Sequence, residues 1–252
     1  MKKKENGKII TIKNITDIIQ SKRTIAWATM AQKLAHEIKT PLSTVMLSAQ
    51  RLQMEYEQKP KEMKKIAKYL NNITGQVDRL RKVTDAFMKF VKMDKAKIEP
   101  IQINQLLSNC LEDVQQKTSK GIKIKNEFAT DIPTFKADGQ QLSIALNNIF
   151  DNSLNAMKDK GTMTITTRLV QSLQTQSETQ LKNSIQIEIT DTGKGIPKDH
   201  INQLFQPFFS KSPGGTGLGL VITKKIVEDH EGEIKIVSEE GIGTSVFILL
   251  PV

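Results

Sequence analysis

The chain has 252 residues, of which 38% are hydrophobic and 25% charged, and its formal net charge is +10 at pH 7. These values are typical of a soluble globular protein with one large domain or two ordinary ones, and they disfavour disorder throughout. No apolar run approaches the ~18 residues that cross a bilayer. The single cysteine, Cys110, cannot form an internal disulfide. We therefore expect a cytoplasmic protein, or the cytoplasmic part of a membrane-bound receptor, with no membrane span in this chain.

The positive charge lies largely in lysines scattered along helical patterns such as LRKVTDAFMKFVKMDKAK. Only 5% of the residues are aromatic, so few rings are present for stacking bases. A solvated helix face explains the charge better than nucleic-acid binding does, and we expect no nucleic-acid partner. The same charge can attract an anionic nucleotide or an acidic partner surface.

Residues 1–20 contain a polar turn and a short β-like alternation, ENGKIITIKNITDIIQ. This segment resembles the last strand of a PAS sensor domain and its exit into a connecting helix. We therefore expect residues 1–20 to be a linker or the remnant of an upstream sensor domain, if the chain is a fragment. A naturally short protein is the alternative.

Residues 21–97 have a helical pattern with one break, at QKPKE. Apolar residues recur at steps of three and four on both sides of the break, which predicts two antiparallel helices with a heptad-like seam. One such hairpin has too little core alone, so we expect a homodimer in which two hairpins form a four-helix bundle. The predicted seam consists of Ala31, Leu34, Ile38, Leu42, Val45, Ala49, Leu52 and Tyr56, followed by Ile66, Leu70, Ile73, Val77, Leu80, Thr84, Phe87 and Val91.

Residues 98–252 mix strand and helix patterns. The strand patterns include IKIKNEF, TMTITTRLV, SIQIEIT, EIKIVSEE and TSVFILLP, and the helix patterns are NQLLSNCLEDV, GQQLSIALNNIFDNSLNAM and LGLVITKKIVEDH. The polar stretch QSLQTQSETQLKNS is interpreted as a structureless hairpin tip. The predicted fold class is α+β: a helical hairpin followed by an α/β two-layer sandwich with helices on one face of the sheet.

The residues around His36 in LAHEIKTPL are suited to proton transfer and to the orientation of water. His36 lies two residues from a seam position on either side, roughly 200° around the helix from each, so its ring is expected to face solvent. Glu37 can accept a proton or hold the imidazole tautomer that leaves one ring nitrogen free to attack. Thr40, one turn on, can orient a water molecule. His200 and His230 have no such neighbours and are expected at the surface.

The helix pattern LNNIFDNSLNAM contains several asparagines. Asn148 and Asn152 are four residues apart and share one helical face. Because Asn is a poor helix former, its repeated occurrence in one helix pattern suggests a role other than helix formation. Amide oxygens are suitable ligands for Mg²⁺, which keeps waters and phosphate oxygens in its other positions. A solvated polar face is the alternative explanation.

The segment IQIEITDTGKGIP predicts a strand that ends at Asp191, followed by a sharp turn at Gly193 and Gly195. A carboxylate at this place can accept from the exocyclic amine of adenine, and it rejects guanine, which presents an oxygen there. Downstream, LFQPFFSKSPGGTGLGL runs into a helix that begins near Leu218. The free N–H groups of such a helix suit phosphate. The spacing differs from that of a P-loop.

In this order, the motifs resemble those of the sensor histidine kinases of two-component signalling. LAHEIKTPL resembles their H box, LNNIFDNSLNAM the N box, DTGKGIP the G1 box, LFQPFF the F box, GGTGLGL the G2 box, and GIGT the closing glycine motif. The resemblance covers nearly everything from residue 30 onward. It implies a dimerisation and phosphotransfer bundle, placed at residues 21–97, and a Bergerat-type ATP-binding domain, placed at residues 98–252.

The resemblance also implies residue roles. His36 corresponds to the phosphoacceptor, Glu37 to its acid/base partner and Thr40 to the residue that assists phosphatase activity. Asn152 corresponds to the Mg²⁺ ligand, with Asn148 assisting. The remaining matches concern nucleotide binding. Asp191 corresponds to the residue that recognises adenine, and Gly193 and Gly195 to the loop beneath the base. The lid segment on the phosphate side corresponds to Gly215, Thr216, Gly217, Leu218 and Gly219.

The chain departs from the family pattern at two positions next to this site. Ser153 stands where the family commonly has alanine, which is a mild change. Asn155 stands where many members have lysine or arginine to contact phosphate. Lys194 or Lys211 is then the candidate source of positive charge at the phosphates.

We therefore expect Mg-ATP-dependent phosphorylation of His36 and transfer of the phosphoryl group to an aspartate of a response-regulator receiver domain on a separate protein. One alternative is a member that acts chiefly as a phosphatase of that regulator. Another is a non-catalytic dimeric scaffold that binds nucleotide without reacting. A gyrase-like ATPase is disfavoured, because such enzymes have no use for a helix bearing HEIKTP.

Overall fold

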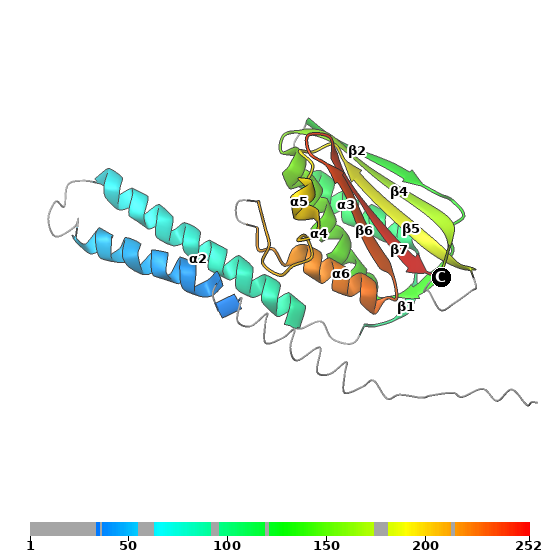
Figure 1. Ribbon diagram of the computed structural model, residues 1–252, viewed down its shortest axis with the longest axis horizontal. Coiled ribbons are helices and arrows are strands. Elements are labelled where there is room, and N and C mark those ends of the chain that lie inside the picture. Colours follow the sequence, from blue (N-terminus) through cyan, green and yellow to red (C-terminus); the bar gives the residue numbers. More distant parts are fainter. Residues whose placement is uncertain are drawn as a thin grey trace, which may run out of the picture.

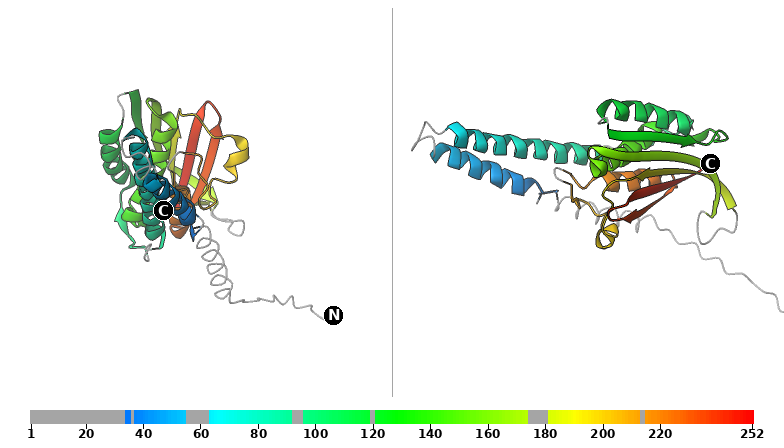
Figure 2. Two further views of the ribbon diagram at one scale, coloured as in Figure 1. Left: turned by 90° about the vertical axis from the view of Figure 1, so that its left-hand side faces the viewer. Right: turned by 90° about the horizontal axis from the view of Figure 1, so that it is seen from above.

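The computed structural model describes residues 34–35, 37–54, 63–91, 96–118, 121–173, 181–212 and 215–252. A helical hairpin projects from a C-terminal lobe, in which helices pack on a β-sheet (Figure 1 and Figure 2). His36 and the predicted sensor remnant at residues 1–20 lie outside the described residues. Within the described ranges, no helix is both long enough and apolar enough to cross a bilayer.

The hairpin consists of a helix at residues 37–54 and helix α2 (Met63–Val91), which lie side by side (Figure 1). The predicted seam divides into two sets by exposure. The half-buried set is Leu34, Ile38, Val45 and Leu52 on the first side, with Ile66, Ile73, Leu80 and Phe87 in α2. The exposed set is Leu42, Ala49, Leu70, Val77 and Thr84. Its large apolar members are Leu42, Leu70 and Val77, with 56%, 47% and 51% of their surface open to solvent. We call these three residues the outer stripe, because a single hairpin leaves them uncovered.

The C-terminal lobe is built on a five-stranded sheet with the order β2-β4-β5-β7-β6. Strands β2 and β4 are parallel, and the other neighbours are antiparallel. A separate two-stranded sheet pairs β1 with β3. The strands are β1 (Glu99–Ile101), β2 (Gly121–Phe128), β3 (Phe135–Ala137), β4 (Lys160–Leu173), β5 (Leu181–Asp191), β6 (Glu233–Glu239) and β7 (Gly243–Pro251).

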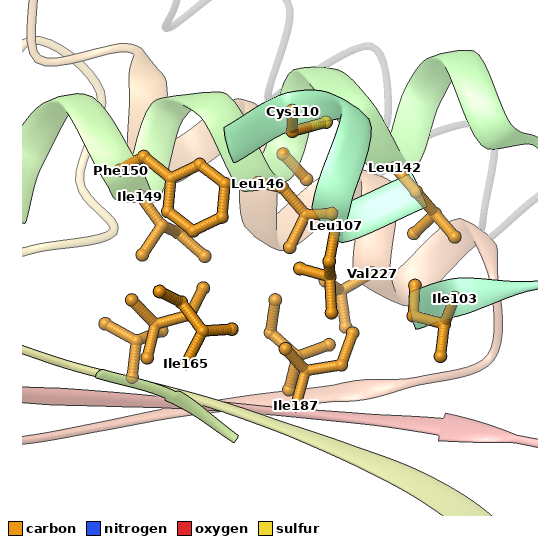
Figure 3. Close-up of a cluster of buried hydrophobic side chains, with 14 of the residues drawn as sticks. Ile103, Leu107, Cys110, Leu142, Leu146, Ile149, Phe150, Ile165, Ile187 and Val227 are labelled. Carbon is orange, nitrogen blue, oxygen red and sulfur yellow. The ribbon is translucent and has the colours of Figure 1, made fainter. Parts of the chain in front are cut away.

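One face of this sheet is covered by the helices α3 (Ile103–Lys117), α4 (Gly139–Met157) and α6 (Gly219–Asp229), whereas α5 (Lys198–Ile201) is a single turn near β6. Alternate residues of each strand point toward the helices, so the isoleucines of β5 are buried as the sequence predicted. Figure 3 shows side chains of α3, α4 and α6 meeting Ile165 of β4 and Ile187 of β5. The predicted α+β fold class, with a two-layer lobe, is confirmed.

Two details differ from the sequence prediction. The polar stretch at residues 171–184, interpreted as structureless, is partly strand, since Gln171 lies opposite Asn183 and Leu173 opposite Leu181. Backbone hydrogen bonds extend the pairing of β4 with β5 here, and they form without an alternation of apolar side chains. The short elements β3 and α5 were not predicted, because three or four residues show too little periodicity.

Asp138 joins three parts of the lobe. Its Oδ1 accepts from the Gln141 N–H (3.0 Å), which caps the N-terminus of α4. Its Oδ2 accepts from the N–H of Lys97 (2.7 Å), in the connection that follows α2. Its own N–H donates to Nε2 of His230 (2.9 Å), at the end of α6. The start of α4, the end of α6 and the chain leaving the hairpin are thus held at one residue.

His230 is buried, so its predicted surface position is wrong. Its Nδ1 lies 2.8 Å from the carbonyl oxygen of Ile226, one turn earlier in α6. A carbonyl can only accept and the Asp138 N–H can only donate, so these bonds assign the neutral tautomer with the proton on Nδ1. The partner on Nε2 comes from 92 residues away in the sequence, which local patterning does not reveal.

We expect the Asp138 carboxylate to stabilise the fold at neutral pH. Burial raises the pKa of Asp138, but N–H donation from Gln141, Lys97 and Gln140 outweighs burial, and the net pKa is lowered. A lowered folded-state pKa stabilises the fold above the ordinary value of 3.8 and ceases to do so as the pH falls through the folded value. Replacing Asp138 by Ala should therefore cost about 1–2 kcal/mol at pH 7.

Urea unfolding of the wild-type and Asp138→Ala chains, followed by circular dichroism at several pH values, measures this effect. The difference between the two chains should shrink below pH 3.8. Asp138→Asn is the matched control, because it keeps one acceptor for the helix cap and loses the charge, so its stability should be intermediate. An equal difference at all pH values would contradict the role of the ionised carboxyl group.

Candidate active site

Asp191 ends strand β5 and lies beneath helix α4, with only 4% of its surface exposed. Its Oδ1 accepts from the N–H of Gly193 at 2.9 Å. The Ser153 hydroxyl on α4 and the Thr244 N–H on β7 also donate to this carboxylate. Burial raises the pKa of Asp191, and these three donors lower it only in part, so the net pKa is raised. The carboxylate is therefore desolvated and oriented by donors from three separate elements.

The loop after Asp191 passes closely under α4 because it contains two glycines. A Cβ on Gly193 would lie 2.7 Å from the Cβ of Ala156, and the next N–H, that of Lys194, donates to the Ala156 carbonyl oxygen at 3.2 Å. Gly195 has φ +64° and abuts the backbone of Glu239, so a side chain there would collide. The predicted sharp turn at these two glycines is present, and it holds the loop between α4 and the β6–β7 turn.

Helix α4 brings the predicted asparagines to one face, at intervals of four and three residues. Asn148 is half-buried, and its Nδ2 donates to the carbonyl oxygen of Gly219 at 3.2 Å. Its amide oxygen therefore remains available to a ligand. Asn152 and Asn155 are exposed. Asn148 marks the Gly219 end of this face, where α6 begins, and Asn152 follows it toward Ser153, which contacts the Asp191 carboxylate. Asn155 lies on the far side of Ser153.

Among the residues that the structure describes, none caps the N-terminus of α6 with its side chain, so the first N–H groups of this helix are without such a partner. Leu218 precedes this helix and is fully buried, so only its backbone can contact a nucleotide. The hydroxyl of Thr216 accepts from the Leu218 N–H at 3.4 Å. Gly217, with φ +65°, accepts at its carbonyl oxygen from the N–H of Phe208 (3.0 Å). Gly217 is therefore held against the backbone of Phe208 and Phe209.

The predicted sources of positive charge lie in two loops. Lys194 is exposed in the loop after Asp191. Lys211 is exposed, and its Nζ lies 6.0 Å from the ring centroid of Phe209. Gly215, also in the lid segment, is exposed. Neither lysine forms an ion pair with a described residue, so both can contact an anion.

The chemistry of these residues fits an adenine nucleotide with Mg²⁺. A buried carboxylate can accept from an exocyclic amine, and the open start of α6 suits phosphate. Asn148, which contacts Gly219, and Ser153, which contacts Asp191, lie about one and a half helical turns apart along α4. The exposed amide oxygen of Asn152 lies between them and suits a hard cation that keeps phosphate and water ligands.

The opposite face of the sheet carries a shallow groove of about 290 Å³, which contains none of the predicted site residues. It is lined by Gln186, Glu233, Lys235, Val237, Phe247 and Leu249. These side chains come from the strand positions that alternate with the buried ones. The candidate site therefore lies on the helix side of the lobe.

On the hairpin, Glu37 and Thr40 lie in the described part of the first helix. Thr40 is exposed, and Glu37 is half-buried. The Oε2 of Glu37 lies 3.3 Å from a guanidinium nitrogen of Arg79 on α2. Sequence patterning did not identify Arg79, Ser153 or Thr244 as site residues. Only Ser153 gave a local signal, as a polar residue at a buried helix position.

Two family models match the chain. The His Kinase A (phospho-acceptor) domain matches residues 26–96, and the family described as Histidine kinase-, DNA gyrase B-, and HSP90-like ATPase matches residues 137–252. The first range includes the HEIKTP segment, and the second includes α4, the Asp191 loop and α6.

Curated relatives carry both regions. The sensor histidine kinase ZraS of Escherichia coli (strain K12) is 28% identical over 234 residues, which cover 92% of this chain and 47% of ZraS. The sensory histidine kinase/phosphatase NtrB of Vibrio alginolyticus is 32% identical over 225 residues, which cover 88% of this chain and 62% of NtrB. The chain thus spans about half the length of these relatives.

A solved structure shows the same arrangement of hairpin and lobe. Histidine kinase ThkA, in a complex with the response regulator protein TrrA, matches with a TM-score of 0.69 and 21% identity. The match covers 92% of this chain and 63% of the ThkA chain. At 21% identity, the structural similarity to ThkA supports the assignment of the fold alone. With both family models and these relatives in agreement, the chain belongs to the sensor histidine kinases of two-component systems.

Proposed function

We propose that the chain is the catalytic core of a sensor histidine kinase, which uses Mg-ATP to phosphorylate His36 and passes the phosphoryl group to an aspartate of a response-regulator receiver domain. One observation carries this proposal: α4 connects the buried carboxylate of Asp191 with the uncapped start of α6. Residues 21–97 serve dimerisation and phosphotransfer, and residues 98–252 bind ATP.

The lobe residues orient the nucleotide. Asp191 accepts from the adenine amine, and the N–H groups at the start of α6 contact phosphate oxygens. Asn152 and Asn148 hold Mg²⁺, which neutralises phosphate charge. Lys194 and Lys211 supply positive charge in place of the residue replaced by Asn155, and the segment from Gly215 to Gly219 covers the phosphates.

On the hairpin, a ring nitrogen of His36 attacks the γ-phosphorus in line. The new N–P bond forms as the bond to the bridging oxygen of ADP breaks, and Glu37 accepts the proton that leaves the ring. The protein contributes mainly positioning and charge neutralisation to such a transfer.

The outer stripe supports a homodimer. Leu42, Leu70 and Val77 recur at heptad-compatible positions and remain about half exposed in one chain. A second hairpin that covers them would complete a four-helix bundle, as the His Kinase A match also suggests.

The same helix can serve a second activity on the same partner. The relative NtrB is named a kinase/phosphatase, and ThkA is found in a complex with a response regulator protein. Thr40 is exposed one turn after His36 in the sequence, where its hydroxyl can orient a water toward a phosphorylated regulator. The proposal also includes phosphatase activity and a cytoplasmic location. If the chain is a fragment, it further includes an upstream sensor domain.

Incubation with γ-labelled ATP tests the phosphoacceptor. The wild-type chain should gain one acid-labile phosphate, measured by intact mass, and His36→Gln should gain none, because its amide is not a nucleophile. His200→Gln is the matched control and should retain the label. A label that survives on His36→Gln would exclude the assignment, and nucleotide binding without any label on the wild type would indicate the scaffold alternative.

Replacing Asp191 by Asn should weaken ATP binding about 10- to 100-fold, because a hydrogen bond to a charged group contributes roughly 1.5–3 kcal/mol. Calorimetric titration with a non-hydrolysable ATP analogue measures the loss. The variant should also discriminate less against GTP, since an amide can donate to the guanine oxygen.

Glu188→Gln is the matched control for this change, because Glu188 lies on the same strand and faces the opposite side of the sheet, where it pairs with Arg168. Its affinity for ATP should equal that of the wild type. Unchanged affinity in Asp191→Asn would refute the adenine-binding role.

Replacing Val77 by Lys should raise the dissociation constant of the dimer about 100-fold, because each of two copies loses roughly 1.5 kcal/mol of apolar burial. Light scattering after size-exclusion chromatography at falling concentration measures the effect. Asn72→Lys is the control, since Asn72 is exposed on the opposite side of α2. A Val77→Lys chain that remains as dimeric as the control would argue against the outer stripe as the interface.

A further inference from the structure

An ion pair connects the two helices of the hairpin beside the histidine segment. A terminal guanidinium nitrogen of Arg79 lies 3.3 Å from Oε2 of Glu37, and the two residues are 42 positions apart in the sequence. Glu37 follows His36 directly. The contact therefore fixes a carboxylate next to the phosphoacceptor in the chain, and it does so from the opposite helix.

The contact uses one oxygen of the carboxylate. Within the part of the chain that the structure describes, only Oε2 of Glu37 has a hydrogen-bond partner, and that partner is Arg79. The side chains of Glu37 and Arg79 are 31% and 47% exposed. Oε1 thus keeps its capacity to accept a proton while the guanidinium limits the rotation of the carboxylate.

The position of the pair on the hairpin also suits this role. Arg79 lies two residues beyond Val77, about 160° around α2, and Glu37 lies five residues before Leu42, about 140° around the first helix, so both face away from the outer stripe. A second hairpin packed on the outer stripe therefore leaves the pair accessible from the other side, where a nucleotide-carrying lobe can approach.

We propose that Arg79 is a positioning residue for phosphorylation of His36: its guanidinium orients the carboxylate of Glu37 through Oε2 and leaves Oε1 to receive the proton from the histidine ring. The proposal rests on the proposed kinase function and adds a residue to it. Arg79 itself contacts neither nucleotide nor histidine in this scheme, and it acts through Glu37.

A merely structural ion pair is the competing explanation. Pairs with this degree of exposure add little to stability, so loss of the contact alone should leave the hairpin folded. Arg81 offers a direct comparison, because it lies on the same helix and pairs with Asp78 one turn away on that helix. Its pair has the same chemistry but does not reach the first helix.

The test measures initial rates of autophosphorylation by the full chain over a range of ATP concentrations. Arg79→Gln should lower the maximal rate about 10-fold, a part of the ~10²–10⁴-fold that general base catalysis contributes, and leave KM for ATP unchanged. Arg79→Lys should recover most of the rate, because an ammonium group can pair with the same oxygen. Arg81→Gln should behave as the wild type does.

A double-mutant cycle then separates positioning from structure. In a Glu37→Gln background, the further change Arg79→Gln should have no effect on the rate, because the carboxylate through which Arg79 acts is gone. A 10-fold loss that persists in this background would show a structural role and overturn the proposal. So would an unchanged or increased rate in Arg79→Gln alone.

Failure of the kinase function and failure of the positioning role give different results. A wild-type chain that binds ATP and never becomes labelled contradicts the proposed kinase function, and the role of Arg79 with it. A wild-type chain that is labelled at the same rate as Arg79→Gln contradicts the positioning role and leaves the kinase function intact. Melting curves of each variant, expected to match the wild type, show that rate changes do not come from unfolding.

Discussion

The lobe depends on keeping one carboxylate buried at the end of a strand. Asp191 is almost fully removed from solvent, and burial disfavours its charged form. Donors from the following loop, from α4 and from β7 offset this cost, and each donor requires its own element to be in place. The loop, the helix and the sheet must therefore assemble before the carboxylate can be presented to a ligand. The proposed nucleotide site forms only when these elements have folded together.

The remaining parts of the site are held relative to that carboxylate by short, specific contacts. Asn148 joins α4 to the start of α6, and Asp138 joins the start of α4 to the end of α6 through His230. Because Asp138 also accepts from the N–H of Lys97, the chain that leaves the hairpin is fastened to the same two helices. One connection between the hairpin and the helices α4 and α6 therefore runs through a capped helix terminus, and Phe87 of α2 adds a contact with the hydrophobic core of the lobe.

Much of the fold was predictable because it follows from local periodicity. The helix that carries the asparagines and the strand that ends at Asp191 have strong patterns, and both are present. Part of the predicted seam, such as Ile38 and Leu80, is half-buried, but Ser48 and Val83 are buried and were not predicted, whereas the adjacent predicted residues Ala49 and Thr84 are exposed. Periodicity alone did not separate the packed face of each helix from the neighbouring face, because both contain apolar residues. Elements of three or four residues, such as β3, and the polar continuation of β4 and β5 were missed because backbone pairing decides them.

The sequence by itself determined the family, the order of the motifs and the residue types that we propose to bind a nucleotide, because those properties reside in composition and spacing. Only the tertiary structure decided which residues surround each functional group. Ser153 and Thr244 meet Asp191, Arg79 meets Glu37, and His230 meets Asp138 across separations of 38 to 92 residues. Such contacts arise from chain folding and hydrogen-bond geometry, which one-dimensional patterns do not contain.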